Sequence, residues 1–215
     1  MILTVYLTKP TENIPIRNQK EMNSFIHKTI GKDNPYHDSF SDYSISSIQG
    51  GKLIDGVLKF NSNPYIVITS NNEAFINMLV SKFMKKEYEF YGCKFQKLTL
   101  NEFTVNKYYD IIHTISPILL KHENRKITID NEKFSEILYN NCLNKLKYAG
   151  IQDNSFKIEI KKQNLKQKII YVGNTFNICT YGNLIIFGEK NTRKTLYNLG
   201  LGNSTGSGFG TIQIL

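Results

Sequence analysis

A glycine-rich stretch near the C-terminus is the feature that most constrains this chain. Residues 200–210 read Gly-Leu-Gly-Asn-Ser-Thr-Gly-Ser-Gly-Phe-Gly, and five of these eleven residues are glycine. Glycine adopts positive φ angles and lets another backbone approach closely, and free N–H groups in such a loop can bind phosphate. A flexible surface loop is the other interpretation of this composition. Phe209, a large apolar residue between two glycines, argues against it.

The order of elements around this stretch excludes two common phosphate-binding motifs. No Gly-Lys-Ser or Gly-Lys-Thr follows the glycines, so the stretch is not a Walker loop. A dinucleotide-binding fingerprint should leave a strand and open a helix. Here a short helix is expected first, over residues 191–198, and a strand over residues 211–215 closes the chain.

The first half of the chain predicts elements in the order β-α-β-β-α-β, which is the ferredoxin-like arrangement. Residues 2–7 predict a strand, and apolar residues at helical spacing after Asn18 predict a helix. Gly50 and Gly51 are expected to form a turn. A hairpin is expected around Asn61-Ser-Asn-Pro64. Asn71 or Asn72 is expected to cap a second helix, and an extended segment follows over residues 88–103.

The second half repeats this order. Its expected elements are a strand over 108–119, a helix that begins after Asn131, strands over 156–160, 175–180 and 183–187, and the two elements named above. We therefore predict an α+β fold of two ferredoxin-like domains, residues 1–105 and residues 106–215. The second domain would carry a basic hairpin and the glycine-rich loop.

Charge is distributed unevenly between these halves. The 215-residue chain has a net charge of +9, of which residues 1–105 contribute +2 and residues 106–215 contribute +7. The second half is therefore expected to bind a polyanion. A solvated lysine-rich surface is the alternative interpretation of the same composition.

Cysteine spacing and hydropathy argue against a metal-binding, disulfide-stabilised or membrane-spanning protein. Cys93, Cys142 and Cys179 are scattered, and no C-x-x-C pair occurs. The sequence thus suggests neither a zinc site nor a disulfide framework, and we expect a reduced, cytoplasmic protein without metal or other cofactor. No apolar stretch approaches the length of a membrane span, so no membrane association is expected.

Together these features resemble the repeat-associated mysterious proteins, the RAMP superfamily. More narrowly, the chain resembles the CRISPR-associated endoribonucleases that cut precursor CRISPR RNA within its repeats. The resemblance spans nearly the whole chain. It rests on Gly200, Gly202, Gly208, Phe209 and Gly210, on Ile115-Ser-Pro-Ile118, on residues 43–52, and on the basic hairpin at residues 157–168.

The resemblance implies a metal-independent cleavage of RNA. The ribose 2′-hydroxyl attacks the neighbouring phosphate and leaves a 2′,3′-cyclic phosphate and a 5′-hydroxyl. This chemistry needs a base, an acid, and positive charge or N–H donors near the phosphorane. In the family a histidine in the loop after the first helix usually transfers the proton, with help from lysine and tyrosine.

Four histidines are available for this role, and His37 is the first candidate. It lies in the expected loop over residues 31–42, where functional residues concentrate, and its ordinary pKa suits proton transfer. A turn histidine bonded to Asp38 is the alternative interpretation. His27 on the first helix is the second candidate, with a plain surface residue as its alternative. His113 is expected to pack in a sheet, and His122 to be exposed.

The chain departs from the family pattern near His37, because no lysine follows within a few residues. Lys28, Lys32 or Lys52 would have to supply the assisting charge, and Tyr36 and Tyr43 are alternative proton donors. The superfamily also contains binding subunits without nuclease activity. A non-catalytic subunit that binds guide RNA in a CRISPR effector complex is therefore the alternative function.

The predicted RNA contacts are lysines, one arginine and the glycine-rich loop. Phosphate contacts are expected to dominate, because ordinary side chains cannot read the deep groove of an A-form stem. The expected partner is CRISPR repeat RNA, with other effector subunits as further partners and a monomer or homodimer as the assembly. An RNA-binding module with an unrelated, RRM-like sheet is the weakest alternative, since no RNP1 run is present. The predicted contacts are Lys28, Lys52, Lys157, Lys161, Lys162, Lys166, Lys168, Arg193, Lys194, Gly200, Gly202, Asn203, Ser204, Gly206, Gly208, Phe209 and Gly210.

Overall fold

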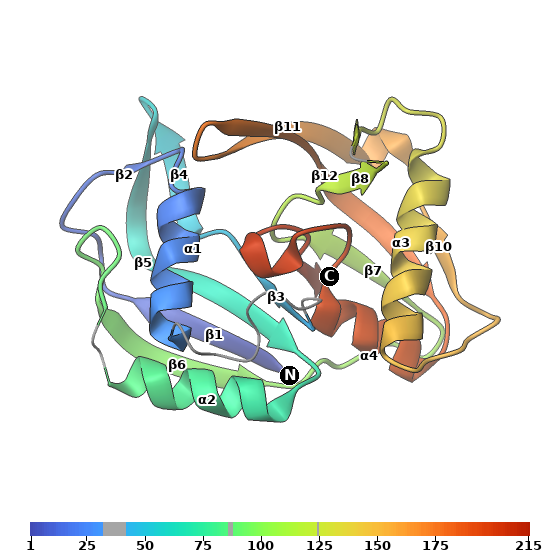
Figure 1. The fold of residues 1–215 in the computed structure, drawn as a ribbon, viewed down its shortest axis with the longest axis horizontal. Helices are drawn as coiled ribbons and strands as arrows, with labels where there is room; N and C mark the ends of the chain where they lie inside the picture. Colours follow the sequence, from blue (N-terminus) through green and yellow to red (C-terminus); the bar gives the residue numbers. More distant parts are fainter. Residues whose placement is uncertain (32–41, 86–87, 124) are drawn as a thin grey trace.

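A computed structural model describes residues 1–31, 42–85, 88–123 and 125–215 of the chain. In these residues two large antiparallel sheets lie side by side, as Figure 1 shows, and a third sheet is a two-stranded hairpin. In both sheets the strand order is ferredoxin-like: the fourth strand of the β-α-β-β-α-β unit pairs with the first, and the first pairs with the third. This confirms the predicted fold class.

The first sheet has the order β6-β1-β5, and three short strands pair along the remaining edge of β5. Helix α1 is amphipathic, and its Met22 and Ile26 pack with the strand residues Leu3 and Ile66 in one core. The elements are β1 (Ile2–Leu7), β2 (Ile14–Pro15), α1 (Gln19–Ile30), β3 (Tyr43–Ile45), β4 (Gln49–Ile54), β5 (Val57–Ser70), α2 (Glu73–Met84) and β6 (Phe95–Asn101).

The second sheet has the order β10-β12-β7-β13, and β11 pairs with β12. Its core joins Phe134 and Leu138 of helix α3 and Leu196 of helix α4 to the strand residues Ile112 and Leu184. The elements are β7 (Tyr109–Thr114), α3 (Phe134–Tyr148), β10 (Lys157–Glu159), the 3-10 turn η1 (Lys162–Asn164), β11 (Leu165–Val172), β12 (Thr175–Phe187), α4 (Lys190–Leu199), the 3-10 turn η2 (Thr205–Ser207) and β13 (Ile212–Ile214). A small hairpin of β8 (Leu120–His122) and β9 (Arg125–Ile127) precedes α3.

The predicted hairpin around residues 61–64 is wrong. Residues 57–70 form the single strand β5, and its hairpin partner is β4, which contains Gly50 and Gly51. The turn between them lies at Asp55 and Gly56, both with positive φ, as a tight hairpin turn requires. The strands predicted separately over 175–180 and 183–187 are likewise one strand, β12.

Helix starts were predicted with mixed success. The Asn72 side chain accepts a 3.0 Å bond from the Phe75 N–H and caps α2 as expected. Asn18 stands before α1, but its side chain donates to the Pro15 carbonyl and does not cap the helix. Lys133, and not Asn131, stands at the N-cap position of α3, and its side chain makes no capping bond. The Asn131 side chain accepts a 2.9 Å bond from the Lys133 N–H.

Buried polar contacts join the two sheets and their helices. The hydroxyl groups of Ser44 and Thr211 lie 2.6 Å apart, and the Thr69 hydroxyl donates to the Asn198 carbonyl at 2.9 Å. The N-terminal amine of Met1 also bonds to the Asn198 side chain at 3.0 Å.

A domain boundary near residues 102–107 stays a prediction. In the described parts of the chain, no helix is long and apolar enough to span a membrane.

Candidate nucleic-acid interface

Helix α1 presents one flank to the glycine-rich loop. The Gln19 Nε2 atom donates to the Asn23 Oδ1 atom at 3.0 Å and to the Ser207 carbonyl at 3.1 Å. Side chains four positions apart share a helix face, so His27 continues the row that Gln19 and Asn23 begin. His27 is half-buried there. The structure therefore places one candidate catalytic histidine on the helix flank that meets the loop.

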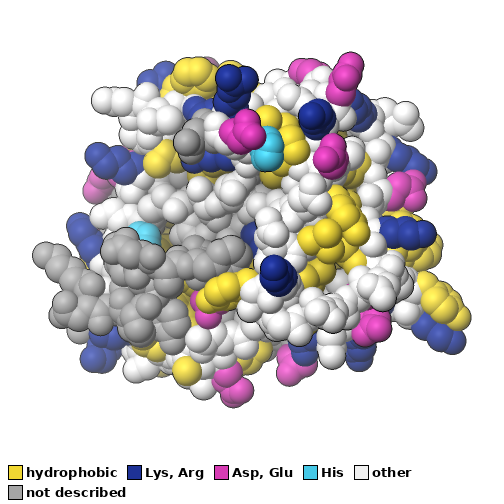
Figure 2. Space-filling view, turned by 45° about the vertical axis from the view of Figure 1, so that its right-hand side comes forward, with side chains coloured by type: hydrophobic (Ala, Val, Ile, Leu, Met, Phe, Trp, Pro, Cys, Tyr) yellow, Lys and Arg dark blue, Asp and Glu magenta, His cyan; other side chains and the backbone are white. Residues whose placement is uncertain are grey.

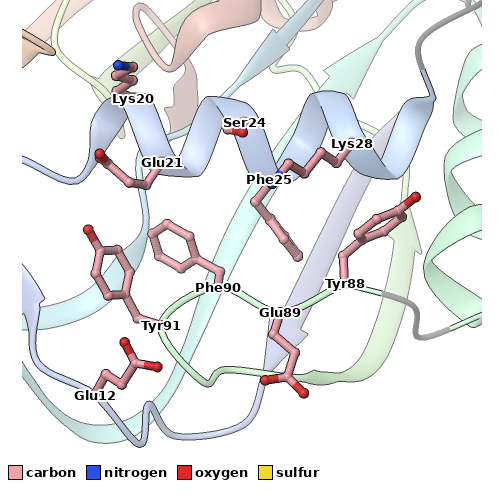
Figure 3. Close-up of a pocket in the computed structure, with 10 residues that line it drawn as sticks. All are labelled: Glu12, Lys20, Glu21, Ser24, Phe25, Lys28, Tyr88, Glu89, Phe90 and Tyr91. Atoms are coloured by element: carbon pink, nitrogen blue, oxygen red, sulfur yellow. The ribbon is translucent and has the colours of Figure 1, made fainter.

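The other exposed flank of α1 lines a pocket of about 580 Å³ (Figure 3). Lys28 belongs to this flank, which points away from the row of Gln19 and His27. Burial, together with the carboxylates of Glu21 and Glu12, raises the pKa of Tyr91 in the pocket wall. The pocket is lined by Glu12, Lys20, Glu21, Ser24, Phe25, Lys28, Tyr88, Glu89, Phe90 and Tyr91.

The glycine-rich loop packs between the two halves of the molecule. A Cβ atom on Gly200 would lie 2.8 Å from the Gly210 carbonyl oxygen, and one on Gly208 would overlap the Gln19 side chain. Both glycines have positive φ, so any other residue would also strain the backbone. Phe209 is buried against Leu119 and Cys179, which explains a large apolar residue in this loop.

Several loop N–H groups are used inside the protein. Leu201 donates to the Gly210 carbonyl, Gly210 donates to Pro117, and Asn203 donates to Leu119. Gly202 and Gly206 are buried, whereas Ser204 is exposed in a left-handed conformation. Asn203 and Ser207 are half-buried, and the remaining residues of 200–210 are buried, so the loop serves first as a packing element.

Tyr43 does not fit the predicted role of proton donor. Its side chain is only 4% exposed and its ring stacks on Phe75 at a centroid distance of 4.5 Å. Burial and the neighbouring Asp42 raise its pKa. Tyr43 contributes instead through its carbonyl, which accepts a 3.1 Å bond from the Thr205 hydroxyl in the loop.

Arg193 does not fit the predicted RNA contact either. Its guanidinium is buried and forms a 2.5 Å ion pair with Asp110. The remaining donors bond to the carbonyls of Gly188 and Asn106 at 3.0 and 2.6 Å. These bonds use the guanidinium within the protein, where a phosphate cannot reach it. The neighbouring Lys194 is half-buried and pairs with Glu102 at 3.1 Å.

The predicted lysines of the second half lie on the surface. Lys161 pairs with Glu159 at 3.5 Å, and the Lys168 Nζ atom lies 5.8 Å from the centre of the Tyr181 ring. Lys52 is also exposed, on β4 of the other sheet. Figure 2 shows that the lysines and arginines of one face are spread around it, with acidic residues among them. The exposed members of the second half are Lys157, Lys161, Lys162, Lys166 and Lys168.

His37 and Tyr36 lie outside the described residues. The sequence analysis missed a buried lysine beside the loop: Lys145 of α3 donates to the carbonyls of Leu199 and Gly200 at 3.2 and 2.9 Å. Its burial could have been predicted from its helical spacing, because it lies on the apolar stripe of α3 with Cys142 and Leu146. Among residues 1–31, 42–85, 88–123 and 125–215, no three His, Cys, Asp or Glu side chains form a metal-binding group.

Solved structures share this fold over the full chain. One titled "CRISPR associated protein Cas6" has a TM-score of 0.81 and 22% identity, and covers 100% of this chain and 99% of its own. "An RAMP protein binding different RNA substrates" has a TM-score of 0.83 and 20% identity, with the same coverage. The product of a Cas6-related gene from Pyrococcus furiosus has a TM-score of 0.82 and 22% identity, covering 100% of this chain and 98% of its own. Comparison with curated protein sequences gives no match.

The chain thus shares its two-sheet fold with solved Cas6 and RAMP structures. The family description "CRISPR associated protein Cas6, C-terminal" matches residues 100–214, which is more than half of the chain. The chain belongs to the Cas6 family.

Proposed function

We propose that this chain is an endoribonuclease that cleaves precursor CRISPR RNA within its repeats and releases guide RNAs. The observation that carries the proposal is the bond between Gln19 and Ser207, which holds the His27 flank of α1 against the glycine-rich loop. His27 lies on this flank, eight residues along α1 from the bond to the loop, and Ser204 of the loop is exposed. Family membership supplies the class of substrate.

The proposed reaction needs no metal. A base takes the proton of the ribose 2′-hydroxyl, the 2′-oxygen attacks phosphorus, and the bond to the 5′-oxygen breaks. An acid gives the departing 5′-oxygen a proton, which leaves a 2′,3′-cyclic phosphate and a 5′-hydroxyl. We assign the proton transfers to His37 and His27, with Lys28, Lys32 or Lys52 as the source of positive charge. The exposed lysines of β10, η1 and β11 would bind the RNA backbone.

A second candidate function is RNA binding without cleavage, as a guide-RNA-binding subunit of an effector complex. The burial of Tyr43 favours this alternative, because it removes one of the proposed proton donors from the surface. The position of Lys28 also favours this alternative, because Lys28 lines the pocket on the flank of α1 away from the loop. In this case the partners would include other effector subunits as well as RNA.

Product mapping distinguishes the two functions. The protein is incubated with the repeat RNA of its own host in the presence of EDTA, and the RNA ends are identified. Cleavage within the repeat to a 2′,3′-cyclic phosphate and a 5′-hydroxyl supports the endoribonuclease. Tight binding without any product supports the non-catalytic subunit, and absence of binding contradicts both.

A further inference from the structure

The pocket of about 580 Å³ lies on the flank of α1 that faces away from the glycine-rich loop (Figure 3). Its volume is within the range of about 300–1,000 Å³ that is typical of ligand sites. Phe25 of α1 and Phe90 form an apolar floor, since both are buried and their ring centroids lie 5.9 Å apart. Tyr91 is half-buried in the wall, and Tyr88 is 39% exposed at the rim. The pocket therefore offers aromatic surface to a ligand with an aliphatic part.

A tight turn holds Tyr91 in the pocket wall. Phe90 and Cys93 exchange two backbone hydrogen bonds of 3.1 and 2.9 Å, and Tyr91 and Gly92 between them both have positive φ. A Cβ atom on Gly92 would lie 1.8 Å from the Thr11 Oγ1 atom, so the turn packs directly on the segment that precedes β2. The rings of Phe90 and Tyr91 meet edge-on, with centroids 4.9 Å apart. These contacts order the wall before any ligand arrives.

Two carboxylates flank the Tyr91 ring, as Figure 3 shows: Glu12 comes from the segment before β2, and Glu21 from the first turn of α1. Both side chains are exposed. Among the described residues neither carboxylate forms an ion pair. Burial and these two negative charges raise the pKa of the Tyr91 hydroxyl. This end of the pocket therefore has a negative potential that a cation would neutralise.

The two lysines of the pocket lie away from this acidic end. Lys20 points away from the carboxylates in Figure 3. Lys28 is seven residues after Glu21, which corresponds to about 10 Å along the helix axis. The third carboxylate of the pocket, Glu89, is already paired with Lys94 at 3.2 Å. The local negative charge at Glu12 and Glu21 thus contrasts with the net charge of +9 of the whole chain.

We propose that this pocket binds an arginine side chain of a partner protein, with the guanidinium between Glu12, Glu21 and the Tyr91 ring. A planar guanidinium forms paired hydrogen bonds with carboxylates and stacks on aromatic faces, while its aliphatic stem packs on apolar surface. RNA does not fit this end of the pocket, because the two carboxylates repel phosphates. The proposal adds a protein-binding surface to the proposed function, and it does not depend on whether the chain cleaves RNA.

An NMR titration of the full-length chain tests the recognition of arginine. The probe is the peptide acetyl-Gly-Arg-Gly-amide, and the same peptide with citrulline is a neutral control of nearly the same shape. The double variant Glu12→Gln/Glu21→Gln removes the two charges. Its matched control is Glu132→Gln/Glu136→Gln, which changes two exposed carboxylates near the start of α3. Tyr91→Leu removes the aromatic ring and Tyr91→Phe retains it.

We expect the arginine peptide to shift the amide signals of residues 88–93 and of the first turn of α1. The citrulline peptide, and the arginine peptide with Glu12→Gln/Glu21→Gln, should bind about tenfold more weakly. Tyr91→Leu should weaken binding about threefold to tenfold, and Tyr91→Phe and the matched control should bind like the wild type. Equal affinity of the wild type for the two peptides would overturn the proposal, and this comparison needs no variant to fold. Unchanged binding by a folded Glu12→Gln/Glu21→Gln protein would also overturn it.

Photo-crosslinking in cells of the host identifies the source of the cation. Benzoylphenylalanine replaces Tyr88, at the rim of the pocket. We expect a protein adduct with an arginine within a few residues of the crosslinked position, and we expect Glu12→Gln/Glu21→Gln to abolish it. An RNA adduct in place of a protein adduct would overturn the proposal. If no protein adduct forms and spermidine displaces the arginine peptide in the NMR titration, the pocket binds a free polyamine, and the proposal is overturned.

Cleavage assays separate this proposal from the proposed function. The variants of the pocket retain every residue to which we assign a part in cleavage, so Glu12→Gln/Glu21→Gln should process repeat RNA like the wild type. If the wild type recognises arginine in this pocket but does not cleave repeat RNA, only the proposed function is wrong. If it cleaves repeat RNA but does not distinguish arginine from citrulline, only the arginine pocket is wrong.

Discussion

The side-chain amide of Gln19 donates a 3.1 Å hydrogen bond to the carbonyl oxygen of Ser207, 188 residues further along the chain. Gln19 is 5% exposed and also donates to Asn23. This residue thus ties the first turn of α1 to the glycine-rich loop. It links the helix that carries His27 to the glycine-rich loop.

Gln19→Ala should loosen this link. We expect a loss of about 1–2 kcal/mol in the free energy of unfolding, because the substitution leaves the Ser207 carbonyl without its partner. We also expect slower cleavage of repeat RNA, because the helix and the loop would no longer be held in register. Urea unfolding and single-turnover cleavage measure the two effects. Gln152→Ala, at an exposed site, is the control, and equal behaviour of the two variants would contradict the assignment.

Arg193 is expected to matter for stability rather than for RNA contact. Arg193→Ala leaves Asp110 buried without its partner, and removal of one member of a buried ion pair typically costs about 3–5 kcal/mol. Lys194→Ala removes the half-buried neighbour, whose partner Glu102 is exposed, and should cost less than about 1 kcal/mol. Urea denaturation compares the two. A stably folded Arg193→Ala protein that has lost RNA affinity would show that the arginine contacts RNA after all.

Lys145 gives the stability of the protein a pH dependence. Burial lowers its pKa from 10.5 to about 8 in the folded state. Between pH 8 and pH 10.5 the unfolded chain therefore binds more protons than the folded chain, and the free energy of unfolding rises with pH. Over pH 8–10 this rise is about 2 kcal/mol for the one group.

The measurement compares the wild type with Lys145→Met by urea unfolding at several pH values. We expect the wild type to gain stability relative to Lys145→Met as pH increases from 8 to 10. Lys147→Met, an exposed lysine of the same helix, should leave the slope of the wild type unchanged. Parallel curves for the wild type and Lys145→Met would show that Lys145 titrates normally.

The basic hairpin should govern the salt dependence of RNA binding. Changing Lys161, Lys162, Lys166 and Lys168 together to Ala should weaken binding and flatten the slope of log K against log salt by up to about 3, because fewer counterions are released. A control with Lys82, Lys85, Lys133 and Lys147 changed to Ala has the same net charge and should retain the slope of the wild type. If the two variants lose slope equally, binding depends on net charge and not on this hairpin.

The sequence predicted the two ferredoxin-like units because their helices are amphipathic and their strands alternate. The prediction of a hairpin turn at 61–64 was wrong because Asn61 and Pro64 are typical turn residues. The Asp55-Gly56 pair, which is a stronger predictor of a hairpin turn, was not used. Pro64 fits within β5 because it lies where the pairing with β4 shifts between Phe60 and Tyr65. The sequence could not show this register.

The candidate site was less accessible to sequence analysis. Arg193 was expected at the surface because it is charged, but its spacing to Leu196 and Tyr197 follows the apolar stripe of α4. Tyr43 likewise alternates with Ile45 in a buried strand. The contacts that bury these residues, such as Asp110 with Arg193, join segments far apart in the chain. Periodicity in one element cannot reveal such a partner.

The most direct test of the central claim is single-turnover cleavage of repeat RNA in EDTA by the wild type, His37→Ala, His27→Ala and the exposed-site control His122→Ala. A general acid–base residue typically contributes about 10²–10⁴-fold in rate. We predict that His37→Ala lowers the rate by a factor in this range with RNA affinity nearly intact, and that His122→Ala cleaves like the wild type. If only His27→Ala lowers the cleavage rate, His27 and not His37 is the main proton-transfer residue. A wild-type protein that binds the repeat but never cleaves it would contradict the account and assign the chain to the non-catalytic RNA-binding subunits.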